Sequence, residues 1–304
     1  MISSVLDILG KYGRFVKFSH TLFALPFAGI AFILAFLRTP GLTLGEWGMK
    51  FFWILVCMVG ARSAAMGFNR WADRSFDSKN PRTANREIPA GKISDAAAIV
   101  FILLSALLFF VGSWFLNSLS FYLSAPTLFL LLTYSYTKRF TFLCHFYLGL
   151  SIGLAPLATW IALREEFSWI PVLWTLGLAF NLSGFDILYA LQDKDFDEKE
   201  GLHSVPVFFG LENSLWISRF SHVLSLCFLA WAGYESELSG IFWIFWFATG
   251  FLMAGEQWIA RKNKDGIFPP AFYGIHSWIS VVLFAGILLE KLREISDSLR
   301  RLGI

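Results

Sequence analysis

Charged residues are scarce in this sequence, and cysteines are scarcer. Only 15% of the 304 residues are Asp, Glu, Lys or Arg, whereas 56% are hydrophobic and the mean hydropathy is +0.60. The net charge of +3 is too small to indicate a nucleic-acid partner. Cys57, Cys144 and Cys227 lie in separate apolar segments without the spacing of a metal site or a disulfide, so we expect packing residues.

Long apolar segments are what the sequence has in abundance. About 20 apolar residues cross a hydrocarbon layer of ~30 Å as a helix. Nine such spans are predicted, at 19–37, 47–68, 94–114, 118–136, 141–163, 169–190, 211–232, 239–259 and 270–290. Lys11, Arg14 and Lys17 precede the first, but no small-residue cleavage pattern follows, so we expect a retained helix and not a signal peptide. The predicted fold class is an all-α integral membrane protein with one domain over 1–304.

Lys and Arg are distributed unevenly among the predicted loops. If the N-terminus is cytoplasmic, the even-numbered loops carry most of them, and the odd-numbered loops hold little beyond Arg38, Lys50 and Arg164. The positive-inside rule then places the even-numbered loops in the cytoplasm, for a bacterial protein on the inner side of the inner membrane. The basic tail EKLREISDSLRR disagrees, since nine spans would place it outside. Either it lies on the membrane as an amphipathic helix or the number of spans is wrong by one.

A first acidic cluster follows the second apolar span, in the stretch FNRWADRSFDSKNPRT. Asn69, Asp73 and Asp77 stand four residues apart, so their side chains project from one face of a helix. Pro81 disfavours helix at Asn80, so we expect the helix to end there. The carboxylates should therefore emerge at a solvated, cytoplasmic helix end.

A second acidic cluster, YALQDKDFDEKEG, follows the sixth span. Asp193 and Asp197 are again four apart, with Asp195 and Glu198 beside them. Because four predicted helices separate the clusters, the architecture suggests two pseudo-equivalent four-helix halves and a ninth helix.

Hard oxygen ligands at this density favour Mg²⁺, which keeps several waters and commonly bridges to phosphates. We therefore predict that the two clusters hold Mg²⁺ on either side of a diphosphate. The residues expected to contact that diphosphate are Arg74, Lys79, Tyr134, Lys138 and Arg139. The alternative is that the acidic residues are merely solvated and the basic residues merely set the topology.

In three of its motifs the sequence resembles the UbiA superfamily of intramembrane prenyltransferases. NRWADRSFDSKNPRTANR is similar to its first Asp-rich motif, YSYTKRFT to its Tyr-x-x-x-Lys segment, and DILYALQDKDFDEKEGLHSVP to its second Asp-rich motif. The resemblance runs from about Lys17 to Gly210, and beyond that only the hydropathy agrees. REIPAG stands where the family commonly has Arg-Pro, which puts the local loop path in doubt.

The resemblance implies nine helices around a central cavity and Mg²⁺-dependent transfer of a prenyl group from a polyprenyl diphosphate to an acceptor. The implied metal ligands are Asn69, Asp73, Asp77, Asp193 and Asp197, and the implied diphosphate contacts are Tyr134, Lys138 and Arg139. Of these, Asp73, Asp193, Lys138 and Arg139 would assist the ionisation of the allylic diphosphate.

The acceptor implied by the resemblance is a hydroxyaryl carboxylic acid of quinone biosynthesis. The second motif is most similar to the 4-hydroxybenzoate branch and its menaquinone-pathway relatives of the futalosine route, so the acceptor is 4-hydroxybenzoate or 1,4-dihydroxy-6-naphthoate. Two alternatives stay open. One is an acceptor without a carboxylate, such as heme or a chlorophyll precursor, and the other is an ion-coupled transporter, which fits less well because transporter sites lie near the midplane. No general base is indicated beyond Asp193 or a phosphate oxygen.

Two charges lie inside apolar spans. Arg62 precedes Asn69 by seven residues and Asp186 precedes Asp193 by seven, nearly two helical turns, so each should point to the same side as its motif about 10 Å deeper. A charge there costs about 2.5–3.5 kcal/mol, so each needs a partner. Either the two pair with each other, or Arg62, oriented by Asp186, binds the carboxylate of the aromatic acid.

Overall fold

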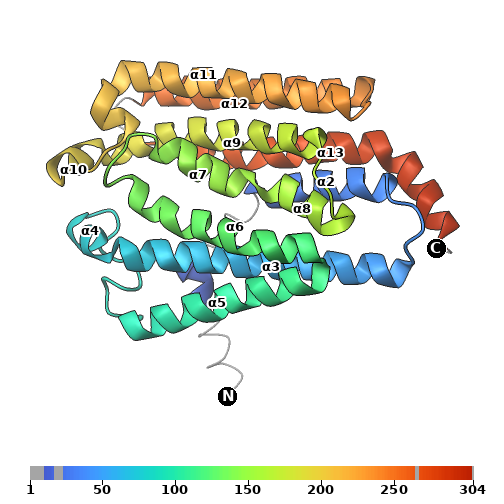
Figure 1. The fold of residues 1–304 in the computed structure, drawn as a ribbon. Helices are drawn as coiled ribbons and strands as arrows, with labels where there is room; N and C mark the ends of the chain where they lie inside the picture. The colour runs from blue at the N-terminus through green and yellow to red at the C-terminus, as the bar shows by residue number, and fades with distance from the viewer. Residues whose placement is uncertain (1–9, 17–22, 264–266, 303–304) are drawn as a thin grey trace. The chain divides into compact units, whose positions relative to one another are not determined.

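The computed structural model describes residues 10–16, 23–263 and 267–302, and regular structure within these ranges is helical throughout. The all-α prediction is therefore confirmed for the described chain. Lys17 and residues 19–22 of the first predicted span lie outside it. The helices are α2 (Leu25–Leu37), α3 (Leu44–Ala72), α4 (Arg74–Lys79), α5 (Asp95–Leu116), α6 (Ser118–Thr137), α7 (Cys144–Gly153), α8 (Ala155–Arg164), α9 (Trp169–Ala190), η2 (Leu191–Asp193), α10 (Lys194–Lys199), α11 (Val205–Glu235), α12 (Gly240–Lys262) and α13 (Pro270–Arg301) (Figure 1).

Length and composition identify membrane-crossing candidates among these helices. Within the described residues, six segments qualify: Leu44–Ala72, Asp95–Leu116, Cys144–Arg164, Trp169–Lys199, Val205–Glu235 and Pro270–Arg301. Leu25–Leu37 is a shorter apolar helix. The membrane-spanning character of the chain is thus supported, whereas the number nine stays a prediction.

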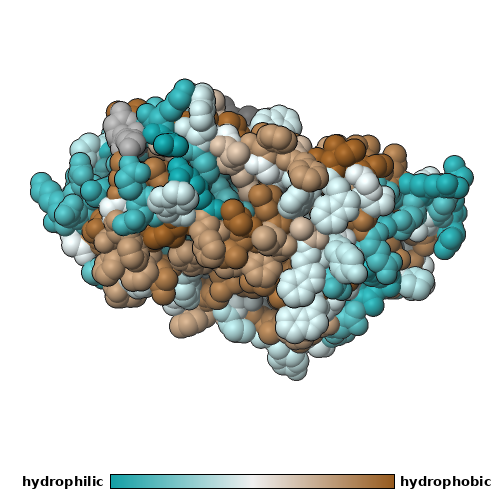
Figure 2. Space-filling view, turned by 90° about the horizontal axis from the view of Figure 1, so that it is seen from above, coloured by the Kyte–Doolittle hydropathy of each residue, from teal (hydrophilic) through white to brown (hydrophobic). Residues whose placement is uncertain are grey.

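Large apolar side chains are exposed along these helices, which is what a lipid-facing surface requires. Trp114 is 64% exposed, Phe129 69% and Phe251 78%. Figure 2 shows hydrophobic residues, in brown, over much of the face that it presents. Of the cysteines expected to pack, Cys57 and Cys144 are buried, but Cys227 is exposed and so is not a packing residue of the interior.

Several helix boundaries follow from local chemistry. Helix α5 begins after Ser94, whose hydroxyl accepts the Ala97 N–H at 3.2 Å. Helix α11 begins at Val205, six residues before the predicted start, because Ser204 caps it in the same way. It is then interrupted at Gly210, where φ is +74°, a value that glycine adopts without strain.

Two predicted segments differ from the structure. The span 141–163 is two helices, α7 and α8, joined at Leu154, where the missing N–H of Pro156 weakens the helical ladder. The tail EKLREISDSLRR continues α13 without a break to Arg301, giving a helix of 32 residues. At 1.5 Å per residue this length exceeds a hydrocarbon layer of about 30 Å, so the structure favours a projecting helix end over a separate helix lying flat.

The described chain divides into two compact units. The first contains residues 10–16 and 52–136, and the second contains residues 23–51 and 137–302. In the first unit, α3 and α5 approach closely at Gly60, where an added Cβ would lie 2.8 Å from the Phe109 nitrogen. The single-domain prediction remains a prediction.

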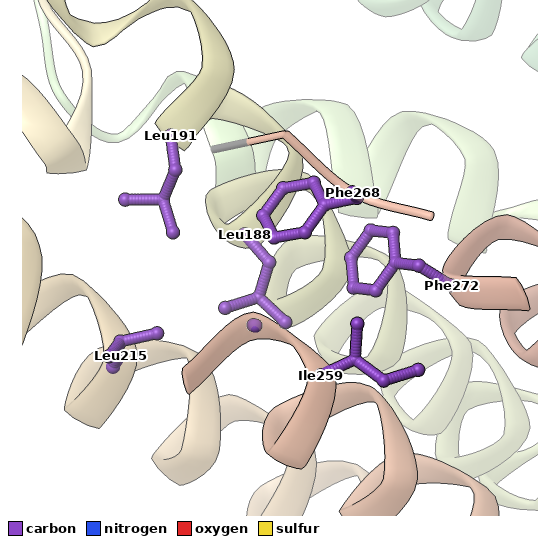
Figure 3. Packing of buried hydrophobic residues seen from close by; sticks show 7 residues of the cluster. Leu188, Leu191, Leu215, Ile259, Phe268 and Phe272 are labelled. Atoms are coloured by element: carbon purple, nitrogen blue, oxygen red, sulfur yellow. The ribbon is translucent and has the colours of Figure 1, made fainter. Parts of the chain in front are cut away.

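The second unit has a tight apolar core around α9, α11, α12 and α13. Figure 3 shows the cluster of buried residues Leu188, Leu191, Leu215, Ile259, Phe268 and Phe272 at one end of these helices. Helix α7 packs on α9 through Gly149, where a Cβ would lie 2.3 Å from the Ala179 carbonyl oxygen. This packing fixes the helix end from which the second acidic cluster emerges.

Candidate active site

The first acidic cluster lies on three successive helical turns, as predicted. The Asp73 N–H donates to the Asn69 carbonyl at 2.9 Å and the Asp77 N–H donates to the Asp73 carbonyl at 2.8 Å, so the four-residue repeat persists from α3 into α4. The Asn69 amide nitrogen donates to an Asp73 carboxylate oxygen at 2.9 Å. Helix α4 ends at Lys79, and Asn80 is extended, as expected for the residue before Pro81.

Burial of Asp77 corrects the expectation of a solvated helix end. Asp77 is 6% exposed, and Arg86 Nη1 donates to both of its carboxylate oxygens, at 2.6 and 2.8 Å. The Thr83 hydroxyl donates to the Asp77 carbonyl at 3.1 Å. Sequence reasoning missed Arg86, although a guanidinium in the loop that returns past the motif is a suitable partner for a buried carboxylate.

The basic residues beside this cluster differ in their surroundings. Arg74 pairs with Asp95 at 3.0 Å and lies over the Trp71 ring, 4.8 Å from its centroid, with its side chain 38% exposed. Lys79 is exposed. Arg74 is therefore already engaged at the surface, whereas Lys79 reaches solvent.

The second acidic cluster is also buried. Asp193 ends the 3₁₀ turn η2 and is 9% exposed, and Asp197, in α10, is 1% exposed. Lys138 Nζ lies 2.7 Å from Asp197 Oδ2. Burial lowers the pKa of the Lys138 ammonium, but the charge of Asp197 and the hydrogen bond to it outweigh burial, so the pKa lies above its ordinary value. Lys138 is thus a permanent cation beside the motif.

Tyr134 and Arg139 flank the end of α6. The Tyr134 hydroxyl lies in the first unit, 3.9 Å from Met66 Sδ, and Arg139 follows Lys138 in the second unit. Arg62 is on α3, two turns before Asn69, and is partly buried.

Asp186 has a partner that the sequence did not predict. On α9, its Oδ2 lies 2.7 Å from Nδ1 of His145, a residue of α7 that is 2% exposed. The other ring nitrogen, Nε2, accepts the Val205 N–H at 3.2 Å. A single histidine in an apolar segment gave no signal beyond its polarity, because its contacts come from residues 41 and 60 positions away.

The oxygen donors fit Mg²⁺ in kind. Carboxylate and amide oxygens are the ligands this ion takes, and it retains waters and substrate phosphates in place of a full protein cage. Among the residues that the structure describes, no group of three or more His, Cys, Asp or Glu side chains is arranged to hold a metal.

Known proteins resemble this chain in sequence and in fold. Residues 22–290 match the UbiA prenyltransferase family model, which extends the resemblance well past Gly210. The 4-hydroxybenzoate octaprenyltransferase of Tolumonas auensis is 33% identical over 230 residues, covering 75% of this chain and 79% of that protein. The apo structure of a UbiA homolog from Aeropyrum pernix K1 has a TM-score of 0.79 at 27% identity, covering 89% of this chain and 98% of that one.

A second solved structure agrees in fold alone. It is a UbiA homolog from Archaeoglobus fulgidus bound to DMAPP and Mg²⁺, with a TM-score of 0.71 at 18% identity, covering 92% of this chain and 98% of that one. The family match and the identity to the Tolumonas enzyme confirm the predicted family and the predicted class of reaction, prenyl transfer by a membrane enzyme. The chain belongs to the UbiA prenyltransferase family.

Proposed function

We propose that this chain transfers a polyprenyl group from polyprenyl diphosphate to a ring carbon of a hydroxyaryl carboxylic acid, with Mg²⁺. The acceptor is 4-hydroxybenzoate or 1,4-dihydroxy-6-naphthoate, and the product is a precursor of ubiquinone or menaquinone. The name of the Tolumonas relative, a 4-hydroxybenzoate octaprenyltransferase, supports an aromatic acid as the acceptor.

The observation that carries the proposal is that acidic residues of both motifs are buried beside a cation. Asp77 contacts Arg86, and Asp197 contacts Lys138. Burying a carboxylate is costly unless it is paired, so a site that only needed solvated acids would not enclose them. A buried set of hard oxygen donors with nearby cations suits a metal-bound diphosphate.

The ligand roles follow from donor type. Asn69, Asp73, Asp77, Asp193 and Asp197 would hold Mg²⁺, which when bound neutralises the diphosphate and makes it a better leaving group. Lys138 and Arg139, with Tyr134 and Lys79, would contact the diphosphate oxygens. Arg74 has the weakest case of the predicted contacts, because it already pairs with Asp95.

The acceptor needs a cation for its carboxylate. Arg62 lies in an apolar helix, where a guanidinium is costly unless used, and its planar fork fits a carboxylate in two parallel hydrogen bonds. An acceptor of heme or chlorophyll type is not a hydroxyaryl acid and would not call for this role of Arg62. Membership of a prenyltransferase family argues against the ion-coupled transporter.

The membrane arrangement completes the proposal. Nine spans would form one domain around a central cavity open to polyprenyl chains from the bilayer, as two pseudo-equivalent four-helix halves and a ninth helix. Both acidic clusters would face the cytoplasm from a bacterial inner membrane, in keeping with the Lys and Arg of their loops.

The test is a product assay. Membranes containing the protein are incubated with Mg²⁺, a long-chain prenyl diphosphate and either 4-hydroxybenzoate or 1,4-dihydroxy-6-naphthoate, and the product is identified by mass. One of the two prenylated acids is expected, and membranes with the Asp193→Asn variant serve as the control. Turnover of neither acid, with prenylation of heme instead, would overturn the proposed acceptor class.

A further inference from the structure

We propose that Asp186 is the general base of the transfer reaction and that His145 is the residue that positions it. This inference rests on the proposed function, since it concerns the hydroxyl proton of the aromatic acceptor. It assigns a role that the two Asp-rich motifs leave open, because their carboxylates are proposed to hold a metal.

The hydrogen bonds of His145 fix the position of its proton. Nε2 accepts the Val205 N–H at 3.2 Å, so this nitrogen must carry its lone pair. In the neutral ring the proton then resides on Nδ1, which donates to Asp186 Oδ2 at 2.7 Å. The basic nitrogen of His145 is occupied by the backbone, so the imidazole cannot serve as the base, and the carboxylate is left to do so.

The second oxygen of Asp186 is available. His145 is 2% exposed, but the Asp186 side chain is 28% exposed, although α9 is one of the most buried helices. Only Oδ2 is hydrogen-bonded within the described residues, and Oδ1 is left without such a bond. His145 therefore holds the Asp186 carboxylate through Oδ2, and Oδ1 stays available to a ligand.

Helix capping alone does not account for this pair. Val205 is the first residue of α11, and its N–H is one of the donors that a helix N-terminus leaves unsatisfied, so His145 does cap this helix. A cap needs only the Nε2 lone pair, however, and any neutral acceptor would provide it. A carboxylate in an apolar span is a cost that capping does not explain.

The proton and electron balance of the reaction has a place for this carboxylate. The acceptor hydroxyl gives its proton to Asp186 Oδ1 as the ring carbon beside it attacks the allylic carbon. A C–C bond forms, and the C–O bond to diphosphate breaks with its electron pair leaving on the diphosphate. The ring ketone that results loses the proton of the alkylated carbon to a diphosphate oxygen, while Asp186 returns its proton to the ring oxygen and aromaticity is restored.

The decisive variant is Asp186→Asn. Asparagine still accepts the Nδ1–H of His145 through its amide oxygen, so the packing is kept, but it cannot take a proton at neutral pH. We expect kcat with 4-hydroxybenzoate to fall 10²- to 10⁴-fold, the usual contribution of a general base, with the KM for prenyl diphosphate and the melting temperature unchanged. Glu235→Gln, an exposed carboxylate on α11, is the matched control and should keep wild-type kinetics.

A fluorinated acceptor separates a base from a structural role. In 3-fluoro-4-hydroxybenzoate the hydroxyl is more acidic, the ring is less nucleophilic, and one carbon beside the hydroxyl stays open. The wild type should be slowed by fluorine, whereas Asp186→Asn should be accelerated, because a pre-ionised hydroxyl no longer needs the base. A matched pair of variants tests the positioning role: His145→Gln, which can still donate to Asp186 and accept from Val205, should retain more of kcat than His145→Leu.

The outcomes distinguish this inference from the function on which it rests. If wild-type protein prenylates 4-hydroxybenzoate but fluorine slows wild type and Asp186→Asn by the same factor, the base assignment is overturned and the proposed function stands. If the wild type prenylates neither 4-hydroxybenzoate nor 1,4-dihydroxy-6-naphthoate, the proposed function is overturned, and this inference with it.

Discussion

Among its described residues, the second unit contains two histidine–carboxylate groups, and the two groups differ in solvent exposure. In the first, His145 holds Asp186, whose side chain is 28% exposed. The second group consists of Glu256, His276 and His222, and we name it the sealed cluster because Glu256 is 0% exposed. Glu256 Oε1 lies 3.0 Å from His276 Nδ1, and Glu256 Oε2 lies 3.8 Å from His222 Nε2. The same residue types thus occur once with access for a ligand and once without.

Helix α9 separates the two groups. Gly184 and Asp186 are two residues apart, about 200° around the helix, so they face opposite ways. The Gly184 carbonyl accepts the Ser218 hydroxyl at 2.7 Å, on the side where a Cβ at Gly184 would lie 2.4 Å from the His222 ring. Phe185, between them, stacks on His276 at 3.6 Å between centroids.

This contrast teaches that polarity inside an apolar bundle has two uses. In the sealed cluster a 3.0 Å hydrogen bond between His276 and Glu256 joins α13 to α12, and Gln257 of α12 donates to Ser218 of α11 at 2.7 Å. A buried charge is tolerated only when such partners satisfy it. We therefore expect loss of stability from changes in the sealed cluster, and loss of activity from changes at Asp186 and at the acids of the two motifs.

The largest effect is expected at the metal-binding motifs, which extend the functional side of the comparison. Asp193→Asn should reduce turnover at least 100-fold because it removes a hard anionic ligand, and EDTA should do the same to the wild type. Thermal unfolding in detergent should change little, since asparagine preserves the volume of a side chain that is 9% exposed. Full activity in EDTA, or in the variant, would contradict the metal role.

The sealed cluster should show the reverse behaviour. Glu256→Ala leaves His276 and His222 facing an uncompensated gap, and breaking a buried pair costs about 3–5 kcal/mol. The free energy of unfolding should fall by that amount, while kcat per folded molecule stays within about twofold. Chemical denaturation followed by tryptophan fluorescence measures the first and the prenylation assay the second.

Glu235→Gln is the control for this loss as well. It changes an exposed carboxylate of α11 that accepts the Trp231 N–H at 3.0 Å, and it should leave stability unchanged. A Glu256→Ala variant that unfolds like wild type but has lost its activity would make the sealed cluster a functional site and remove the contrast.

Substitution of Arg62 tests whether this residue binds the carboxylate of the aromatic acid. Asp186 is hydrogen-bonded to His145, so a role for Arg62 in binding the acid can be tested separately from Asp186. Arg62→Lys would lose one arm of a two-armed contact, and hydrogen bonds to charged groups contribute about 1.5–3 kcal/mol, so the KM for the aromatic acid should rise roughly 10- to 100-fold. The KM for prenyl diphosphate should not move. Unchanged KM values with a lower protein yield would assign Arg62 a structural ion pair instead.

The sequence alone predicted those structural features that depend on a single segment of the chain. Apolar length predicted the helices, and the four-residue spacing predicted that Asn69, Asp73 and Asp77 share successive turns, because helix geometry is local. Pro81 ended α4 as expected. These features need no knowledge of what packs against them.

The sequence was insufficient where a partner comes from elsewhere in the chain. The expectation of solvated carboxylates was wrong for Asp77 and Asp197, because Arg86 and Lys138 compensate their burial. The contacts of His145 were likewise invisible, since they depend on α9 and the start of α11. Hydropathy also treats a proline in an apolar run as neutral, so the division into α7 and α8 was missed.

The smallest effect is expected from a substitution at Gly184, which lies on α9 two residues from Asp186 and next to His222 of the sealed cluster. Gly184→Ala would place a methyl group 2.4 Å from His222 Cδ2 and 3.0 Å from the Ser218 carbonyl oxygen, on the sealed side of α9. Because the Ser218 carbonyl oxygen is a backbone atom and the ring is closer still, the ring and the helix must shift, and overpacking of this kind costs about 1–3 kcal/mol. Gly274→Ala, where an added Cβ meets nothing within 4 Å, is the matched control and should hold or raise stability, since glycine inside a helix is unfavourable.

The fluorine response of kcat, measured on Gly184→Ala, should remain that of the wild type, because Asp186 points away from the insertion. A wild-type melting temperature with an altered fluorine response would instead show that α9 couples the sealed cluster to the base.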